Sequence, residues 1–136
     1  MHKLFVLIAL ALLTACAPIP HIAKVAPEIR GTIYINGIPA VGAQVRQCIE
    51  YQNSNCNSDV SIYTDENGNF ILKQRREFRW YVTLFGDEIF KYGFSVIFNG
   101  VIYPGCSGLD IGALADITYV NYDLTDKETC YLNLGG

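Results

Sequence analysis

The side chains suited to catalysis or metal binding give only weak patterns in this sequence. The run Asp65-Glu66-Asn67-Gly68-Asn69 has the oxygen-rich composition of a calcium loop, but Phe70 and Arg76 stand where an EF-hand needs its glycine and its bidentate acid. We therefore interpret this run as a turn. A catalytic nucleophile would lack a general base, because the one histidine after residue 16 is His21, in the segment expected to be a tether. The sequence also has no GxSxG run. We expect no enzyme activity, no metal and no cofactor.

Two groups of side chains are better suited to binding. Basic residues gather at what the pattern predicts to be the tip of a hairpin, and they are Lys73, Arg75, Arg76 and Arg79. Such a cluster attracts lipid headgroups, an acidic protein or an anionic glycan, and it is also typical of an ordinary solvated loop. The nine tyrosines form the second group, with Tyr34 and Tyr81 expected on an outward face. An exposed tyrosine offers proteins or sugars a large contact area at low entropic cost.

The N-terminal residues predict a location. The apolar run from Leu4 to Leu13 is too short for a spanning helix, which needs about twenty residues. The segment Leu13-Thr14-Ala15-Cys16 resembles the lipobox of bacterial lipoproteins. The resemblance implies a signal peptide over residues 1–15 and an acylated, palmitate-carrying Cys16 that anchors the chain in the lipid bilayer. Ala17 stands where an Asp commonly favours the inner membrane, which implies the outer membrane, facing the periplasm. An ordinary secretory signal with a free Cys16 is the alternative.

The remaining cysteines predict disulfides. Setting Cys16 aside from the five cysteines leaves four, and an exported protein normally pairs an even set. We favour Cys48–Cys56, which flanks a short polar loop, and Cys106–Cys130, which staples the C-terminal segment, although two other pairings are open. No CxxC spacing is present, so a zinc site is the weaker alternative.

Length and composition narrow the class further. The chain has 136 residues, of which 51% are hydrophobic and 17% charged, so it fits one small folded domain and excludes a multidomain enzyme. Disorder is excluded by the same apolar content. The net charge of −3 gives no general attraction to phosphate backbones, so we expect no nucleic-acid partner.

The pattern along the chain predicts a tether and then strands. Residues 16–28 hold the lipidated cysteine and a proline-rich extended tether, and residues 29–136 form the domain. From residue 29 onward, apolar residues alternate with period two, and turn signals stand at Asn36-Gly37, Asn67-Gly68 and Asn99-Gly100. We interpret the second signal as a tight hairpin and the segment from Phe78 to Phe85 as the strongest strand, with Trp80 as a core anchor. Seven to nine short strands at this spacing predict an all-β, antiparallel β-sandwich.

Two runs in the first half of the domain carry a family likeness. They are Gly31-x-Ile33…Asn36-Gly37-x-Pro39-x-x-Gly42-Ala43-x-Val45 and Thr64-Asp65-x-Asn67-Gly68-x-Phe70-x-Leu72. Together they resemble the carboxypeptidase regulatory-like domains, which have a transthyretin-like (prealbumin-like) β-sandwich fold. The resemblance covers about a third of the chain and implies an accessory or binding module, because the hydrolytic chemistry of such carboxypeptidases lies in a separate domain. After Phe85 the chain departs from the family pattern.

The sequence therefore predicts a non-enzymatic, membrane-anchored lipoprotein of the cell envelope. We expect it to act as a protein-binding or structural accessory module with an envelope protein as its partner. The alternative is a periplasmic lipoprotein that binds a glycan or a small ligand.

Overall fold

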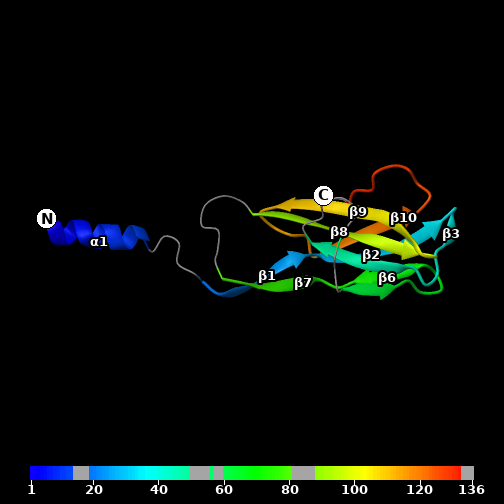
Figure 1. Ribbon diagram of the computed structural model, residues 1–136, viewed down its shortest axis with the longest axis horizontal. Coiled ribbons are helices and arrows are strands. Elements are labelled where there is room, and N and C mark those ends of the chain that lie inside the picture. The colour runs from blue at the N-terminus through cyan, green and yellow to red at the C-terminus, as the bar shows by residue number, and fades with distance from the viewer. Residues whose placement is uncertain (14–18, 50–55, 57–59, 81–87, 133–136) are drawn as a thin grey trace.

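The computed structural model describes residues 1–13, 19–49, 56, 60–80 and 88–132 of the chain. One helix, α1 (His2–Leu13), lies apart from the strands (Figure 1). The other elements in these ranges are ten strands in three sheets. Within the described ranges, no helix has both the length and the apolar character needed to cross a membrane.

Two of the sheets have four strands each. In the first, β2 (Glu28–Ile35) runs parallel to β10 (Ile117–Asp123) and antiparallel to both β3 (Ile38–Pro39) and β6 (Asn69–Leu72). The second has the order β5 (Ser61–Tyr63), β4 (Gln44–Ile49), β8 (Ile89–Phe98) and β9 (Val101–Ile111), with antiparallel neighbours throughout. The prediction of a purely antiparallel arrangement is therefore wrong, because β10 pairs in parallel with β2.

One core lies between the two four-stranded sheets. Ile29 and Ile33 of β2, Val45 of β4 and Phe94 of β8 are fully buried in it. Phe70 of β6 joins them, with its ring centroid 5.3 Å from that of Phe94. These are the alternate positions that period-two patterning assigns to an inner face, so the prediction of a mostly β domain is confirmed.

The three turn signals have two different outcomes. Asn36-Gly37 and Asn99-Gly100 have positive φ at both residues and join hairpin strands, as expected. Asn67-Gly68 does reverse the chain, but the strands before and after it, β5 and β6, belong to different sheets. The prediction of a tight hairpin there is wrong, because the turn residues fix a local reversal without fixing the partner of either strand.

The segment expected to be a tether is partly a strand. His21–Ala26 forms β1, which pairs antiparallel with β7 (Arg75–Arg79) in a two-stranded sheet that we call the β1–β7 ribbon. Val25 and Ala26 are only 2% and 0% exposed. Pro20 and Pro27 flank the strand and remove no bond from its ladder. The ordered domain therefore begins before residue 29.

Trp80 does not lie in the core. Its side chain is 63% exposed and meets the 56% exposed Phe78 edge to face, with 5.1 Å between ring centroids. The expected role as a core anchor is wrong, because none of the sheets in the described part of the chain covers this face of the ribbon. The remainder of the strand expected from Phe78 to Phe85 lies outside the described residues from position 81.

Both favoured disulfides are confirmed. Cys48 joins Cys56, with Cα atoms 5.3 Å apart, and Cys106 of β9 joins Cys130 of the C-terminal segment. Beside the second disulfide, the amide of Leu132 donates to the carbonyl oxygen of Ser107 at 2.8 Å. Two disulfides in a small domain indicate an oxidising, extracytoplasmic compartment.

Candidate functional site

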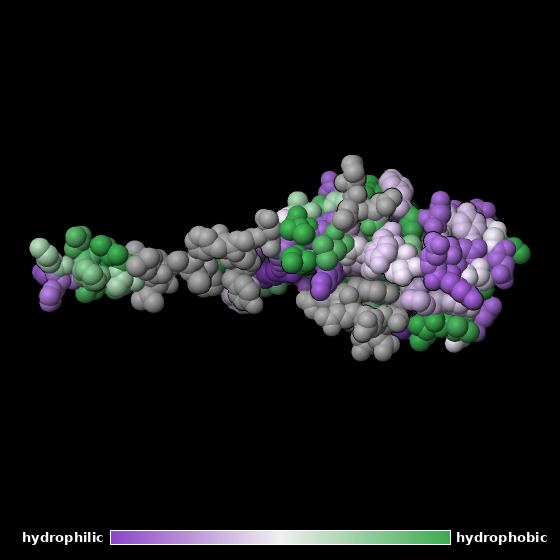
Figure 2. All heavy atoms as spheres, turned by 90° about the horizontal axis from the view of Figure 1, so that it is seen from above, coloured by the Kyte–Doolittle hydropathy of each residue, from purple (hydrophilic) through white to green (hydrophobic). Residues whose placement is uncertain are grey.

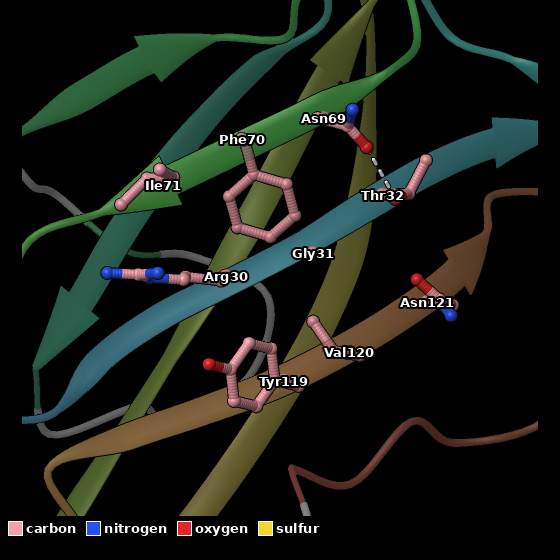
Figure 3. A pocket seen from close by; sticks show the side chains of 9 residues that line it. All are labelled: Arg30, Gly31, Thr32, Asn69, Phe70, Ile71, Tyr119, Val120 and Asn121. Atoms are coloured by element: carbon pink, nitrogen blue, oxygen red, sulfur yellow. Dashed lines mark hydrogen bonds between the residues drawn. The ribbon is translucent and has the colours of Figure 1, made fainter.

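A shallow hollow lies on the outer face of the first sheet (Figure 3). Residues at alternate positions of β2, β6 and β10 point away from the core, and the hollow lies over them. It has a volume of about 430 Å³ and is lined by Arg30, Gly31, Thr32, Asn69, Phe70, Ile71, Tyr119, Val120 and Asn121. We call it the outer-face hollow.

The strand register arranges these side chains in two rows across the sheet. Arg30 stands opposite Ile71 on β6 and opposite Tyr119 on β10, which gives an apolar, a cationic and an aromatic side chain in line (Figure 3). Thr32 stands between Asn69 and Asn121 in the second row. The Thr32 hydroxyl donates to Oδ1 of Asn69 at 2.7 Å.

The cation of the first row is held in place by a neighbour on its own strand. Nε of Arg30 donates to Oε1 of Glu28 at 2.5 Å. The hydrogen bond to Glu28, and then the charge of its carboxylate, raise the pKa of Arg30 above its ordinary value. Arg30 thus stays protonated and oriented, while Tyr119 beside it is 69% exposed.

Chemically, the outer-face hollow is equipped to bind rather than to transfer protons. The Arg30 guanidinium and the Tyr119 ring are flat groups that stack on flat or apolar surfaces, and the Asn69 and Asn121 carboxamides are positioned to exchange hydrogen bonds. Its open form suits a protein surface better than a small molecule, which is normally enclosed over most of its area.

The basic residues predicted to bind a partner lie along a strand and not at the tip of a hairpin. Arg75, Arg76 and Arg79 are in β7, and Lys73 precedes that strand. The reason is that β7 continues from β6 into a separate ribbon instead of turning back.

Two of these four cations have acidic partners. Arg75 lies 3.2 Å from a carboxylate oxygen of Glu77, and Arg79 forms an ion pair with Glu88. Lys73 and Arg76 are exposed. On the neighbouring strand, Nζ of Lys24 lies 2.7 Å from Oδ1 of Asp116, and this hydrogen bond lowers the pKa of Asp116.

A buried polar pair lies inside the second sheet. The hydroxyl of Tyr92 donates to Oδ2 of Asp110 at 3.2 Å, and the amide of Ala115 donates to the same oxygen at 3.1 Å. Burial, followed by the Asp110 charge, raises the pKa of Tyr92 to about 12. The phenol therefore stays protonated and ties β8 to β9.

The acidic run at residues 65–69 forms a turn, as the sequence predicted. Oδ1 of Asp65 accepts hydrogen bonds from the amides of Asn67, at 2.9 Å, and Asn69, at 2.8 Å. Across the described ranges, the structure brings no three His, Cys, Asp or Glu side chains together in a metal-binding arrangement. Cys16 lies outside the described residues, as do Ala17 and Tyr81.

Sequence reasoning missed the outer-face hollow as a site. Alternation alone places Arg30 and Thr32 on an outward face, but it does not reveal that β10 lies beside β2. Tyr119 and Asn121 also alternate outward along their own strand. The outward face of each strand could therefore be predicted from its own residues, but the pairing of β2 with β10 could not.

The fold and these surfaces define a small, disulfide-stapled β domain with binding groups on the face of a sheet. The chain belongs to the family described as "Domain of unknown function (DUF6795)", whose model matches residues 29–103. The match runs from the start of β2 to the start of β9, and it includes both runs that resemble the carboxypeptidase regulatory-like domains. A comparison with curated proteins finds no match.

Proposed function

We propose that this protein is a lipid-anchored lipoprotein of the cell envelope whose domain binds a protein partner as a non-enzymatic accessory module. The outer-face hollow is the observation that carries the proposal. It presents a protonated arginine, an exposed tyrosine and an exposed isoleucine in one row, and aromatic and arginine side chains are enriched in protein interfaces.

The proposed domain type is a transthyretin-like β-sandwich. Two packed sheets with one shared core support it, as do the two motif runs in residues 31–45 and 64–72. In the family that these runs resemble, such a domain accompanies other domains or partners without doing chemistry itself. The Arg30–Glu28 pair supports this non-enzymatic role, because the two side chains neutralise each other's charge and neither is left to act as an acid or a base.

The proposed anchor is Cys16, with residues 1–15 removed as a signal peptide. The lipobox resemblance supports it, and so do the two disulfides, which indicate an extracytoplasmic compartment. Ala17 after the cysteine favours the outer membrane, facing the periplasm. Cys16→Ser is expected to release the protein from the membrane fraction, and intact mass is expected to show acylation of the wild type alone. Unchanged membrane retention of the variant would contradict the anchor.

The partner surface is tested by in-cell photocrosslinking from the outer-face hollow. A photoreactive amino acid at position 119 is expected to give one recurrent protein adduct. The matched control is Tyr63 on β5, which is 65% exposed against 69% for Tyr119 but lies on the other sheet. Equal adducts from both positions, or none from 119, would refute the hollow as the partner surface.

A glycan ligand is the second candidate function. The exposed Tyr119 ring beside the Asn69 and Asn121 carboxamides is the observation that favours it, because sugars stack on aromatic rings and exchange hydrogen bonds with amides. Glycan binding that Tyr119→Ala abolishes, together with an absence of protein adducts, would put this function first.

A further inference from the structure

One face of the β1–β7 ribbon exposes large apolar side chains. Ile22 and Phe78 are register partners, so they lie on the same side, and Trp80 contacts the Phe78 ring. Their exposed fractions are 68%, 56% and 63%. Exposed aromatic and aliphatic groups side by side are the usual mark of a surface that something else covers.

Cations lie on this same face. Lys24 and Arg76 are register partners two residues from the Ile22–Phe78 pair, so all four side chains point to one side of the ribbon. Arg76 is exposed, and so is Lys73, which precedes it by three residues in the chain. The face therefore combines an apolar tip with a basic flank.

The neighbouring sheet also exposes apolar side chains at this end of the domain. Ile89 at the start of β8 and Ile111 at the end of β9 are register partners, 58% and 61% exposed. They lie at the same end of the domain as the ribbon, which is the end nearest α1, and β1 contacts β8 (Figure 1). Seen from above, hydrophobic residues gather at this end beside hydrophilic ones (Figure 2).

The sequence places this end of the domain close to the proposed anchor. Only residues 17–20 separate Cys16 from the start of β1. Five Cα–Cα steps span at most about 18 Å, even when fully extended. With the acyl chains of Cys16 inside the bilayer, the first residues of β1 therefore lie within reach of the headgroups.

We propose that the exposed apolar groups at this end of the domain, Ile22, Phe78 and Trp80 with Ile89 and Ile111, rest on the bilayer surface, and that Arg76 and Lys73 bind anionic phospholipid headgroups. The proposal rests on Cys16 as the anchor. Tryptophan favours the headgroup level of a membrane because its ring is amphipathic, and basic residues near an anionic leaflet are attracted to it. Such seating orients the domain, with the turn between β8 and β9 directed away from the membrane (Figure 1).

Trp80 is itself the reporter, because it is the single tryptophan of the chain. The experiment uses a chain that starts at Cys16, whose thiol is coupled to a maleimide-headgroup lipid in vesicles of phosphatidylcholine with phosphatidylglycerol. The other four cysteines are held in disulfides, so Cys16 alone reacts, and none of the core residues that the structure describes lies in the removed residues 1–15. Trp80 fluorescence is then quenched with lipids brominated on the acyl chain and, separately, with aqueous iodide.

We expect bromolipid quenching and loss of iodide access on vesicles that contain phosphatidylglycerol. Ile22→Ser is expected to restore iodide access, whereas Ile102→Ser, 59% exposed beside the β8–β9 turn, leaves it unchanged. Arg76→Gln removes one cation and is expected to shift the balance of seated to unseated domain about fivefold toward the unseated form.

Three results would overturn the proposal. The first is iodide access on vesicles equal to that of the free chain. The second is protection of Trp80 from iodide on purely phosphatidylcholine vesicles equal to that on vesicles with phosphatidylglycerol, which would show that the basic residues do not bind anionic headgroups. The third is protection of the vesicle-free chain that grows with protein concentration, which would assign the face to a second copy. Because the coupling is chemical, these results are independent of whether cells acylate Cys16, which the mass measurement above decides.

Discussion

The two disulfides are expected to stabilise the domain by different amounts, in a ratio set by the loops they close. Cys106–Cys130 spans 24 residues and Cys48–Cys56 spans 8. The entropy removed from the unfolded chain grows with the logarithm of loop length, which gives about 3.5 kcal/mol for the longer loop and about 2.5 kcal/mol for the shorter. Replacing each pair by alanine should lower the free energy of unfolding by these amounts.

The assay is urea unfolding of the wild type and of the two paired variants, Cys106→Ala with Cys130→Ala and Cys48→Ala with Cys56→Ala. Each protein is measured with and without a thiol reductant. Under reduction, the wild type loses both crosslinks and should fall below either variant measured without reductant. If the shorter loop proved the more stabilising, or if the differences between the proteins persisted under reduction, the loop-entropy reasoning would be refuted and packing around the buried Cys48 and Cys106 would be the cause.

Two further predictions concern the first sheet. Gly31→Ala would place a methyl group 2.0 Å from the backbone oxygen of Val120, and no rotamer relieves a backbone clash, so β10 must shift. We expect a loss of about 3 kcal/mol in chemical unfolding, and an unchanged midpoint would contradict the close approach of the strands. Asp123 accepts hydrogen bonds from Thr125 and from the amides of Gly37 and Asn36, which lower its pKa. A lowered folded pKa means that the stabilisation is present near neutral pH and is lost as the pH falls through it, so Asp123→Asn should be less stable than wild type near pH 7 and equal to it near about pH 2. A constant difference at both pH values would show that the carboxylate charge is not involved.

Local features of the fold were predictable from the sequence. The inner face of β2 follows from alternation, and the Asn36-Gly37 and Asn99-Gly100 turns follow from residues that tolerate positive φ. The disulfide pairs followed from loop lengths and from an even cysteine count. Each of these inferences needs information from only one short stretch of chain or from a simple count.

Pairing between distant segments was not predictable in the same way. The residue types at positions 21–26 do not indicate that β7 is their partner strand, so the sequence predicted a tether there. For the same reason, the sequence predicted Trp80 to be a core residue. Alternation shows which side chains share a face of a strand, but it does not show whether another sheet covers that face. It also hid the outer-face hollow, whose two sides come from residues 30–32 and 119–121.

The parallel pairing of β2 with β10 has a consequence for how the chain is made. Residues 28–34 are synthesised well before their neighbours on that side, which are residues 117–123. The pairing of β2 with β10 therefore waits until residue 123 has been made, and a contact of this sequence separation forms slowly. Until then, the apolar inner face of β2 has only part of its cover, a condition that favours aggregation. The newly made chain therefore benefits from being kept unfolded until β10 has been synthesised.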